Sequence, residues 1–184
     1  SSSGNLNYQN LPREVDNKDT SIKNAFKARP GYVIVQADLK TAEVYIAAVL
    51  SNDKFLQKAF IDQVDFHSYI AKQIFNLPCS AEEVKNKFPD HRQWAKAITF
   101  GIMYQAGART ISETAKVSMQ EAQDFINKYF AEAKDLKRFI DKCNSQIENQ
   151  QFIYSHFCRK RRLIEATASS RGVRNHAIRT GVNF

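Results

Sequence analysis

Features that would mark a membrane protein, a secreted protein or a cysteine-ligated metal site are missing from the sequence. No apolar run approaches the roughly 20 residues that a membrane-spanning helix needs, and the opening SSSGNLNYQN lacks the charged-then-apolar order of a signal peptide. The cysteines, Cys79, Cys143 and Cys158, are scattered and form no CxxC or Cys/His ligand pattern. There is no internal repeat and no low-complexity linker. We expect a soluble, cytoplasmic protein with reduced thiols.

Acidic residues are few relative to basic ones. The chain of 184 residues carries 27 Lys and Arg against 19 Asp and Glu, for a net charge of +8 and a pI near 9.4. Between residues 159 and 179 Glu165 is the only acid, against these bases: Arg159, Lys160, Arg161, Arg162, Arg171, Arg174 and Arg179. This imbalance favours a polyanionic partner, although a solvated basic face is the alternative reading.

The N-terminal part predicts a strand followed by a helix. Residues 1–13 are rich in Ser, Asn and Gln and read as a hydrogen-bonding loop. GYVIVQAD, residues 31–38, follows a Pro-Gly turn signal and predicts a buried strand, and TAEVYIAAVL, residues 41–50, has helical composition. Asp38 therefore falls at the strand-to-helix junction, where an aspartate alone is more often a helix N-cap than a metal ligand.

The remainder of the chain predicts mostly helices. Asp65 is a candidate N-cap for a helix that carries His67 in its first turn, and Ser80 and Ser118 each begin a Ser-x-x-Glu capping box. An apolar stripe after Ser118 predicts one long helix: Ala122, Ile126, Tyr129, Ala133, Leu136, Ile140, Cys143 and Ile147. QFIYSHF and RRLIEA suggest a hairpin, and SSRGVRNHAIRTGV a final helix. We predict a predominantly helical α+β fold with short strands.

One predicted helix carries side chains suited to a nucleotide. In DHRQWAKAITFGIMYQ, residues 90–105, Arg92, Lys96, Phe100 and Tyr104 recur every four residues and so share one helix face. The two cations precede the two aromatics over roughly 18 Å, which suits a triphosphate on the cations and a sugar and base on the rings. The spacing alone equally fits an ordinary amphipathic helix.

Blocks of sequence then indicate a family. In chain order they are SSSGNLNYQNLP, DLKTAE, DFH, RQWAKAITFGIMY, CRKRR and RTGVN. DLKTAE is similar to the motif A pattern Asp-Tyr-Ser-x-x-Glu, and RQWAKAITFGIMY matches the motif B pattern Arg-x3-Lys-x3-Phe-Gly-x2-Tyr. Together, over essentially the whole chain, the blocks resemble the family A DNA polymerases, the group of bacterial polymerase I and many phage replicases. Divergence within the motifs suggests a phage-type member, acting in the cytoplasm of a bacterial or phage-infected cell.

The resemblance implies the palm and fingers of a right-hand polymerase. Residues 1–62 would form a palm segment with motif A, residues 63–157 the fingers with motif B, and residues 158–184 a return to the palm with primer-template contacts. Asp38 would be one of two metal-binding carboxylates, and the Leu39 carbonyl a further ligand, for two Mg²⁺ ions or Mn²⁺ in their place. Asp38 and Lys96 would be catalytic.

Contacts to nucleotide and DNA follow from the same resemblance. The dNTP would meet Glu43, which would crowd the ribose 2′ position, together with His67, Arg92, Lys96, Phe100 and Tyr104. Primer-template DNA would meet Asn7, Gln9, Asn10, Arg179 and Asn183.

The sequence also departs from the family pattern. Leu39 and Lys40 replace the usual Tyr and Ser of motif A, Gln105 replaces the glycine that commonly follows the motif B tyrosine, and Cys158 replaces a turn glycine. The chain stops before the His-Asp-Glu motif that supplies the second catalytic carboxylate. We therefore expect a fragment or subunit that is inactive alone and needs another polymerase chain or segment carrying that motif and a thumb.

Two alternatives stay open at the level of sequence. A noncatalytic nucleic-acid-binding module would use the basic helices but has no use for Asp38 and Glu43, whose charges repel phosphates. A related single-subunit RNA polymerase shares motif B, but Glu43 near the sugar and Phe100 in place of a hydroxylated aromatic favour deoxynucleotides.

Overall fold

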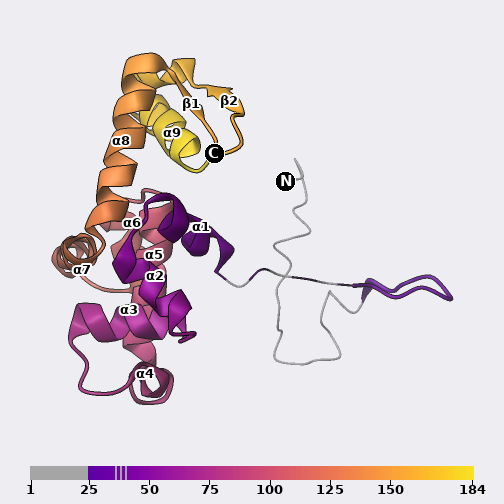
Figure 1. Cartoon of the computed structure of the whole chain (residues 1–184), viewed down its shortest axis with the longest axis vertical. Coiled ribbons are helices and arrows are strands. Elements are labelled where there is room, and N and C mark those ends of the chain that lie inside the picture. The colour runs from indigo at the N-terminus through magenta and orange to yellow at the C-terminus, as the bar shows by residue number, and fades with distance from the viewer. Residues whose placement is uncertain (1–24, 36, 38, 40) are drawn as a thin grey trace. The chain divides into compact units, whose positions relative to one another are not determined.

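The computed structural model describes residues 25–35, 37, 39 and 41–184 (Figure 1). The chain divides into two compact units, Ser1–Lys40 and Thr41–Phe184, which we describe separately. No helix among the described residues is both long enough and apolar enough to cross a membrane.

The described part of the first unit contains a tight turn but no strand. The Tyr32 N–H donates to the Arg29 carbonyl at 3.0 Å, and Gly31 has φ 81°. This is the type II turn that the Pro-Gly pair favours, since its third residue needs a positive φ. The prediction of a buried strand is wrong over residues 31–35, where Val33, Ile34 and Val35 are exposed. A strand needs a hydrogen-bonded neighbour, and among the described residues none pairs with this segment.

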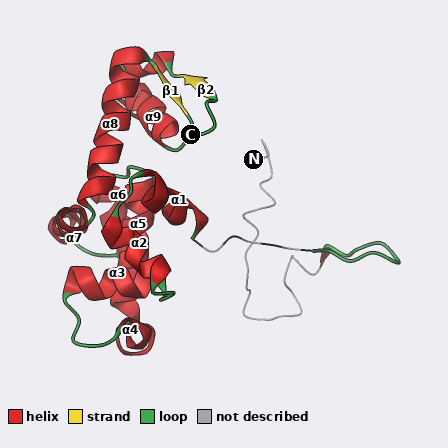
Figure 2. Ribbon diagram, viewed as in Figure 1, coloured by secondary structure: helices red, strands yellow, loops and turns green. Residues whose placement is uncertain are grey.

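The second unit is predominantly helical, with one small antiparallel sheet (Figure 2). The predicted α+β class is confirmed. Its elements are α1 (Ala42–Leu50), α2 (Lys54–Ile61), α3 (Phe66–Phe75), α4 (Ala81–Lys87), α5 (Pro89–Met103), α6 (Ala108–Ala115), α7 (Met119–Glu132), α8 (Lys134–Gln150), β1 (Phe152–Tyr154), β2 (Lys160–Arg162), the 3₁₀ helix η4 (Ile164–Thr167) and α9 (Arg171–Val182).

The predicted helix starts are confirmed where the structure tests them. The Asp65 carboxylate accepts from the Ser68 N–H at 2.9 Å at the start of α3. Ser80 and Ser118 form capping boxes at α4 and α7, since Glu83 and Glu121 accept from the Ser80 and Ser118 N–H groups. Each cap satisfies backbone donors that have no partner within the helix.

The main hydrophobic core lies among α1 to α7 and the first half of α8. Leu56, Ile70, Ile98 and Tyr129 are among its largest fully buried side chains. Trp94 stacks on Phe125, with the two ring centroids 6.1 Å apart. This core fixes the orientation of α5, because α5 packs on α3, α6 and α7.

The prediction of a single long helix after Ser118 is wrong. The helix is interrupted at Ala133, which separates α7 from α8. The apolar stripe itself is buried as expected on both sides of the break. The break is held by Asp53, whose Oδ2 accepts from the Asp135 and Leu136 N–H groups at 3.0 Å each. Its Oδ1 accepts from the Leu56 N–H at 3.1 Å. One carboxylate, 1% exposed, thus caps the starts of both α2 and α8.

A smaller core lies at the other end of α8, beneath the predicted hairpin and final helix, both of which are confirmed. β1 and β2 pair antiparallel, with Phe152 opposite Arg162 and Tyr154 opposite Lys160. Figure 1 shows α8 running from the main helical group to the hairpin and α9. At Gly181 of α9 a Cβ would lie within 3 Å of the ends of the Leu163 and Ile147 side chains, so any larger residue would force these two side chains to shift.

Candidate nucleotide and nucleic-acid site

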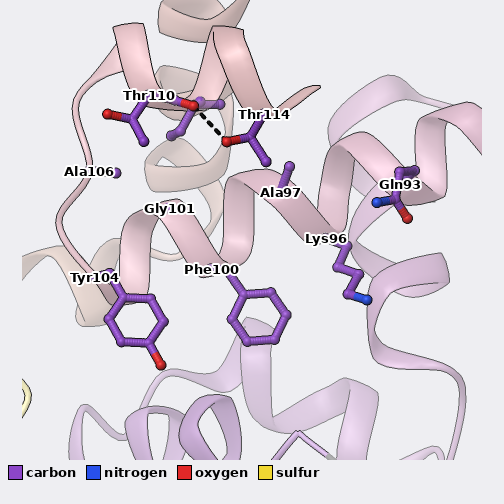
Figure 3. A pocket seen from close by; sticks show the side chains of 10 residues that line it. Gln93, Lys96, Ala97, Phe100, Gly101, Tyr104, Ala106, Thr110 and Thr114 are labelled. Atoms are coloured by element: carbon purple, nitrogen blue, oxygen red, sulfur yellow. Dashed lines mark hydrogen bonds between the residues drawn. The ribbon is translucent and has the colours of Figure 1, made fainter. Parts of the chain in front are cut away.

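Helix α5 presents the predicted row of side chains on one side. Figure 3 shows Lys96, Phe100 and Tyr104 leaving α5 in the same direction. A pocket of about 280 Å³ is lined by α5, the following loop and α6. Gly101 forms the contact between the two helices, because a Cβ there would lie 2.6 Å from Ile111 Cγ1. Thr110 and Thr114 of α6, which sequence reasoning missed, complete the lining; they carry no motif by which they could have been found.

Glu43 and Tyr104 meet although they are far apart in sequence. The Tyr104 hydroxyl donates to Glu43 Oε1 at 2.6 Å, joining the first turn of α1 to the end of α5. The hydrogen bond to this carboxylate, helped by partial burial, raises the pKa of Tyr104 above its ordinary value, so the hydroxyl stays a donor at neutral pH. Both side chains are exposed, so a ligand has access to the pair.

Arg92 is held by the carboxylate that caps α3. Its Nε and Nη2 donate to Asp65 Oδ2 and Oδ1 at 2.9 and 3.0 Å. Burial by itself would raise the pKa of Asp65, but the hydrogen bonds from Arg92 and Ser68 outweigh it and hold that pKa well below its usual range. The same pairing raises the pKa of Arg92. The motif DFH marks this aspartate, yet spacing gave no sign that it would meet Arg92.

His67 contacts Phe100, which lies about two turns beyond Arg92 on α5. His67 is buried, and its ring centroid lies 5.8 Å from that of Phe100. Lys96 is exposed, and it forms no ion pair with the described residues. The structure thus brings Arg92, Lys96 and Phe100 onto one helix with His67 beside them.

Of the two predicted metal ligands, only Leu39 lies within the described part of the chain. Asp38 lies outside the described residues. Leu39 is 82% exposed and belongs to the first unit. Within the described ranges no three His, Cys, Asp or Glu side chains gather as metal ligands would.

The predicted DNA contacts divide in the same way. Asn7, Gln9 and Asn10 lie outside the described residues. Arg179 and Asn183 are exposed and one turn apart at the end of α9, where the Asn183 side-chain amide donates to the Arg179 carbonyl at 2.9 Å. That hydrogen bond orients the Asn183 side chain beside Arg179, and both residues are exposed, so a ligand has access to them.

Two departures from the family pattern fall at left-handed backbone positions. Gln105 has φ 50°, and the Gln105 and Ala106 N–H groups donate to the Ile102 and Gly101 carbonyls, which is the Schellman ending that glycine favours. Cys158 has φ 60° in the loop of residues 155–159 between β1 and β2, again a position that favours glycine. At both positions the backbone is left-handed, the conformation for which glycine is favoured. Because Gln105 and Cys158 carry a Cβ, this conformation is strained in them.

Comparison with known proteins gives the class directly. The sequence profile of DNA polymerase family A matches residues 1–184, so the chain belongs to the family A DNA polymerases. It is 44% identical to the DNA polymerase of Escherichia phage T5, covering 100% of this chain and 24% of that protein. It is 32% identical to DNA polymerase I of Caldicellulosiruptor bescii, covering 98% of this chain and 21% of the relative.

A solved structure agrees. The POL domain of Pol1 from M. smegmatis, in complex with DNA primer-template and dNTP, superposes with a TM-score of 0.78 at 28% identity, covering 99% of this chain and 31% of that one. The chain thus spans about a quarter of the length of the curated relatives, and the family and fold predicted from the motifs are confirmed.

Proposed function

We propose that this chain is the dNTP-handling part of a template-directed DNA polymerase, which extends a primer 3′-hydroxyl by phosphoryl transfer. The observation that carries the proposal is the hydrogen bond between Tyr104 and Glu43, at the opposite end of α5 from Arg92. This bond sets a carboxylate beside the aromatic end of α5, while the other end of α5 is cationic. The cationic end matches the triphosphate of a dNTP, and the aromatic end with its carboxylate matches the sugar and base.

The triphosphate binds along the cationic half of α5. Lys96 is an exposed point charge, and it stabilises the negative charge that accumulates on the leaving pyrophosphate. Arg92 needs only Nε and one N–H of Nη2 for Asp65, so its other N–H groups are left for phosphate oxygens. The ion pair therefore orients the guanidinium before the nucleotide arrives and does not block it.

The sugar lies between Glu43, Phe100 and Tyr104. A carboxylate fixed by a 2.6 Å hydrogen bond cannot easily swing away, so a ribose 2′-hydroxyl would have to displace it or lose its own hydration. His67, packed beside Phe100, completes the wall. Because Phe100 has no hydroxyl to replace a missing 3′-OH, we expect poor incorporation of dideoxynucleotides.

Catalysis further needs divalent metal, for which Asp38 is the ligand in this chain; Mg²⁺ is the ion we propose. Bound metal would activate the primer 3′-hydroxyl and stabilise the leaving group. Primer-template DNA lies against Arg179 and Asn183, and against Asn7, Gln9 and Asn10. This part of the proposal rests on the family motifs.

We further propose that the chain does not polymerise alone and works with a segment that carries the second catalytic carboxylate. Its span of about a quarter of its relatives supports this. The test is dNTP incorporation on a primed template, with and without the complementing polymerase segment. We expect incorporation only in the complemented reaction; incorporation by this chain alone would refute the claim.

The same assay separates the polymerase from a noncatalytic DNA-binding module. In the complemented enzyme, Asp38→Ala should abolish synthesis while primer-template binding stays nearly intact. If Asp38→Ala leaves synthesis unchanged, Asp38 is not a ligand of the catalytic metal, and the result favours the noncatalytic binding module.

A further inference from the structure

Helix α1 is apolar on nearly all sides. Its sequence, AEVYIAAVL, contains one charged residue, Glu43. Val44 and Ala48 are buried in the main core, where α1 packs on α2, α5 and α8. A helix that is apolar all round is typical of the interior of a larger protein, because a helix at a permanent surface carries polar residues on its outer side. The sequence of α1 therefore indicates a further neighbour on its outer side.

The outer side of α1 forms one continuous apolar face. Tyr45, Ile46, Val49 and Leu50 are each between 40% and 55% exposed. At about 100° per residue, these four positions span an arc of about 140° around the helix. We call these four residues the α1 face. Single exposed apolar residues are common on proteins, but a contiguous group of them marks an interaction site.

Other helices at the surface of this unit have a different outer side. The outer side of α8 carries Lys137, Arg138, Asp141 and Lys142, all of them exposed. Such charged side chains are well hydrated, as expected for a helix that faces water. The α1 face is therefore a particular feature of α1 and not a general property of the helices of this chain.

The α1 face has the composition and the order of an interface. The Tyr45 ring packs edge to face on Phe60 of α2, with 5.2 Å between the ring centroids, so it is oriented before any contact is made. The only charge on α1 is that of Glu43, which is already held by Tyr104. The centres of protein interfaces are depleted of charge and enriched in tyrosine. A partner with an apolar surface thus fits this face.

The solved structure similar to this chain indicates which partner that is. The chain superposes on the POL domain of Pol1 from M. smegmatis over 99% of its own length with a TM-score of 0.78, but it covers only 31% of that chain. The same fold therefore occurs there within a structure about three times as long. In sequence, moreover, the predicted metal ligand Asp38 precedes Ala42, the first residue of α1, by four positions. A segment that completes the metal site of Asp38 must dock close to this part of the chain.

We propose that the α1 face binds the remaining part of a family A polymerase domain, the segment that carries the second catalytic carboxylate. The segment covers Tyr45, Ile46, Val49 and Leu50 with apolar side chains, and the removal of both surfaces from water drives the association. The identity of this partner rests on the proposed function. The identification of the α1 face as an interface rests on α1 itself.

The test co-expresses the tagged full chain with the parts of the DNA polymerase of Escherichia phage T5 that flank the region matched by this chain. The amount of T5 polymerase retained on the tag is measured by band density, and its identity is confirmed by intact mass. Ile46→Asp and Val49→Asp each place a charge in the α1 face and should lower the retained amount about tenfold or more, because burying an unpaired charge is strongly unfavourable.

Met119→Asp is the matched control. Met119 of α7 is 56% exposed and Ile46 is 55% exposed, so both variants replace an equally exposed apolar side chain by a carboxylate. Met119→Asp should retain T5 polymerase within about twofold of the wild type. A general effect of added negative charge would instead lower retention in all three variants equally, which would contradict the proposal.

A second readout covers the case in which an aspartate variant does not fold. Benzoylphenylalanine in place of Val49 keeps the α1 face apolar, and irradiation should cross-link it to T5 polymerase, whereas the same replacement of Met119 should give no cross-link. The proposal is wrong if the wild type retains no T5 polymerase, if the aspartate variants retain as much as the wild type, or if Val49 gives no cross-link. It is also wrong if light scattering shows that the wild-type chain alone is a dimer and Ile46→Asp a monomer, because the face then binds a second copy.

Failure of the proposed function would give a different result. T5 polymerase would then be retained through the α1 face, with the sensitivity to Ile46→Asp and Val49→Asp described above, but the complex would not incorporate dNTPs on a primed template. Conversely, incorporation by a complex that forms equally well with both aspartate variants would leave the proposed function intact and overturn the α1 face as the interface.

Discussion

The two ends of the second unit differ in the polar contacts that order their side chains. In the main helical group carboxylates make the long-range polar contacts: Asp53 caps α2 and α8, Asp65 caps α3 and holds Arg92, and Glu43 holds Tyr104. At the hairpin end the cations Arg159, Lys160 and Arg161 lie over aromatic rings and form no ion pair with any residue that the structure describes. The first arrangement gives each carboxylate hydrogen-bond donors and thereby orders the groups that donate to it; the second orders cationic side chains and leaves their charge unneutralised.

This difference suits the two ends to different ligands. A nucleotide pocket must hold its groups in register before the substrate arrives, and paired carboxylates do this. A surface for a nucleic-acid strand must instead keep its positive charge, since neutralising phosphates is the main source of affinity. The predictions below test whether carboxylates stabilise the helical end in proportion to their burial, and whether the left-handed backbone position of Cys158 in the hairpin loop is strained.

The largest effect is expected at Asp53. Asp53→Ala leaves the Leu56, Asp135 and Leu136 N–H groups without their acceptor, and losing two N-caps should lower the free energy of unfolding by roughly 2–4 kcal/mol. Urea denaturation measures it. Asp53→Asn keeps one acceptor oxygen, so its free energy of unfolding should lie between those of the wild type and Asp53→Ala. The exposed carboxylate of Asp141, paired with Lys137, is the matched control: Asp141→Ala should cost less than about 0.5 kcal/mol.

Asp65 should give the next largest effect and a characteristic pH dependence. Asp65→Asn weakens a helix cap and removes the partner of Arg92, at a cost of roughly 1–3 kcal/mol near neutral pH. The folded-state pKa of Asp65 lies below its ordinary value of 3.8, so its stabilisation is complete above that value and is lost as pH falls through the folded pKa. Urea unfolding between pH 6 and pH 3 should therefore show a steeper loss for the wild type than for Asp65→Asn; parallel curves would contradict this.

At the hairpin the expected change is a gain. Cys158→Gly places glycine at the φ 60° position and should raise the free energy of unfolding by about 1 kcal/mol, because a non-glycine residue there is strained. Cys158→Ala removes the thiol but keeps the Cβ, and should give no gain. Equal stabilisation by both variants would mean that the thiol, not the backbone, is responsible.

The smallest stability effect is expected at Glu43. Its contact with Tyr104 is exposed, so Glu43→Gln should change the free energy of unfolding by less than about 0.5 kcal/mol. A loss as large as that of Asp65→Asn would show that this contact fastens α1 to α5, and that burial does not decide how much a carboxylate stabilises.

Local signals in the sequence predicted much of this fold. The Asp65 cap, the Ser80 and Ser118 capping boxes and the hairpin were all predictable, because each depends on residues within one turn or one loop. The break at Ala133 was not, because its cause is Asp53, whose contacts span 82 and 83 residues. The strand at residues 31–35 failed for a related reason: composition marks strand propensity, but pairing depends on a distant neighbour.

The candidate site divides along the same line. Helical spacing placed Arg92, Lys96, Phe100 and Tyr104 on one face of a helix. Arg92 lies on α5, and Figure 3 shows Lys96, Phe100 and Tyr104 leaving that helix in the same direction. Spacing could not show that Tyr104 reaches Glu43 or that Arg92 reaches Asp65, since both contacts join separate helices. The roles of these residues stay predictions. Those of Asp38, Asn7, Gln9 and Asn10 stay predictions that lie outside the described residues.

The most direct test of the central claim compares dNTP with rNTP incorporation by the complemented polymerase, in the wild type and in Glu43→Ala. If Glu43, held by Tyr104, excludes the ribose 2′-hydroxyl, the wild type should strongly prefer dNTPs and Glu43→Ala should narrow that preference by about tenfold or more. Equal use of dNTPs and rNTPs by the wild type, or an unchanged ratio in Glu43→Ala, would contradict the account.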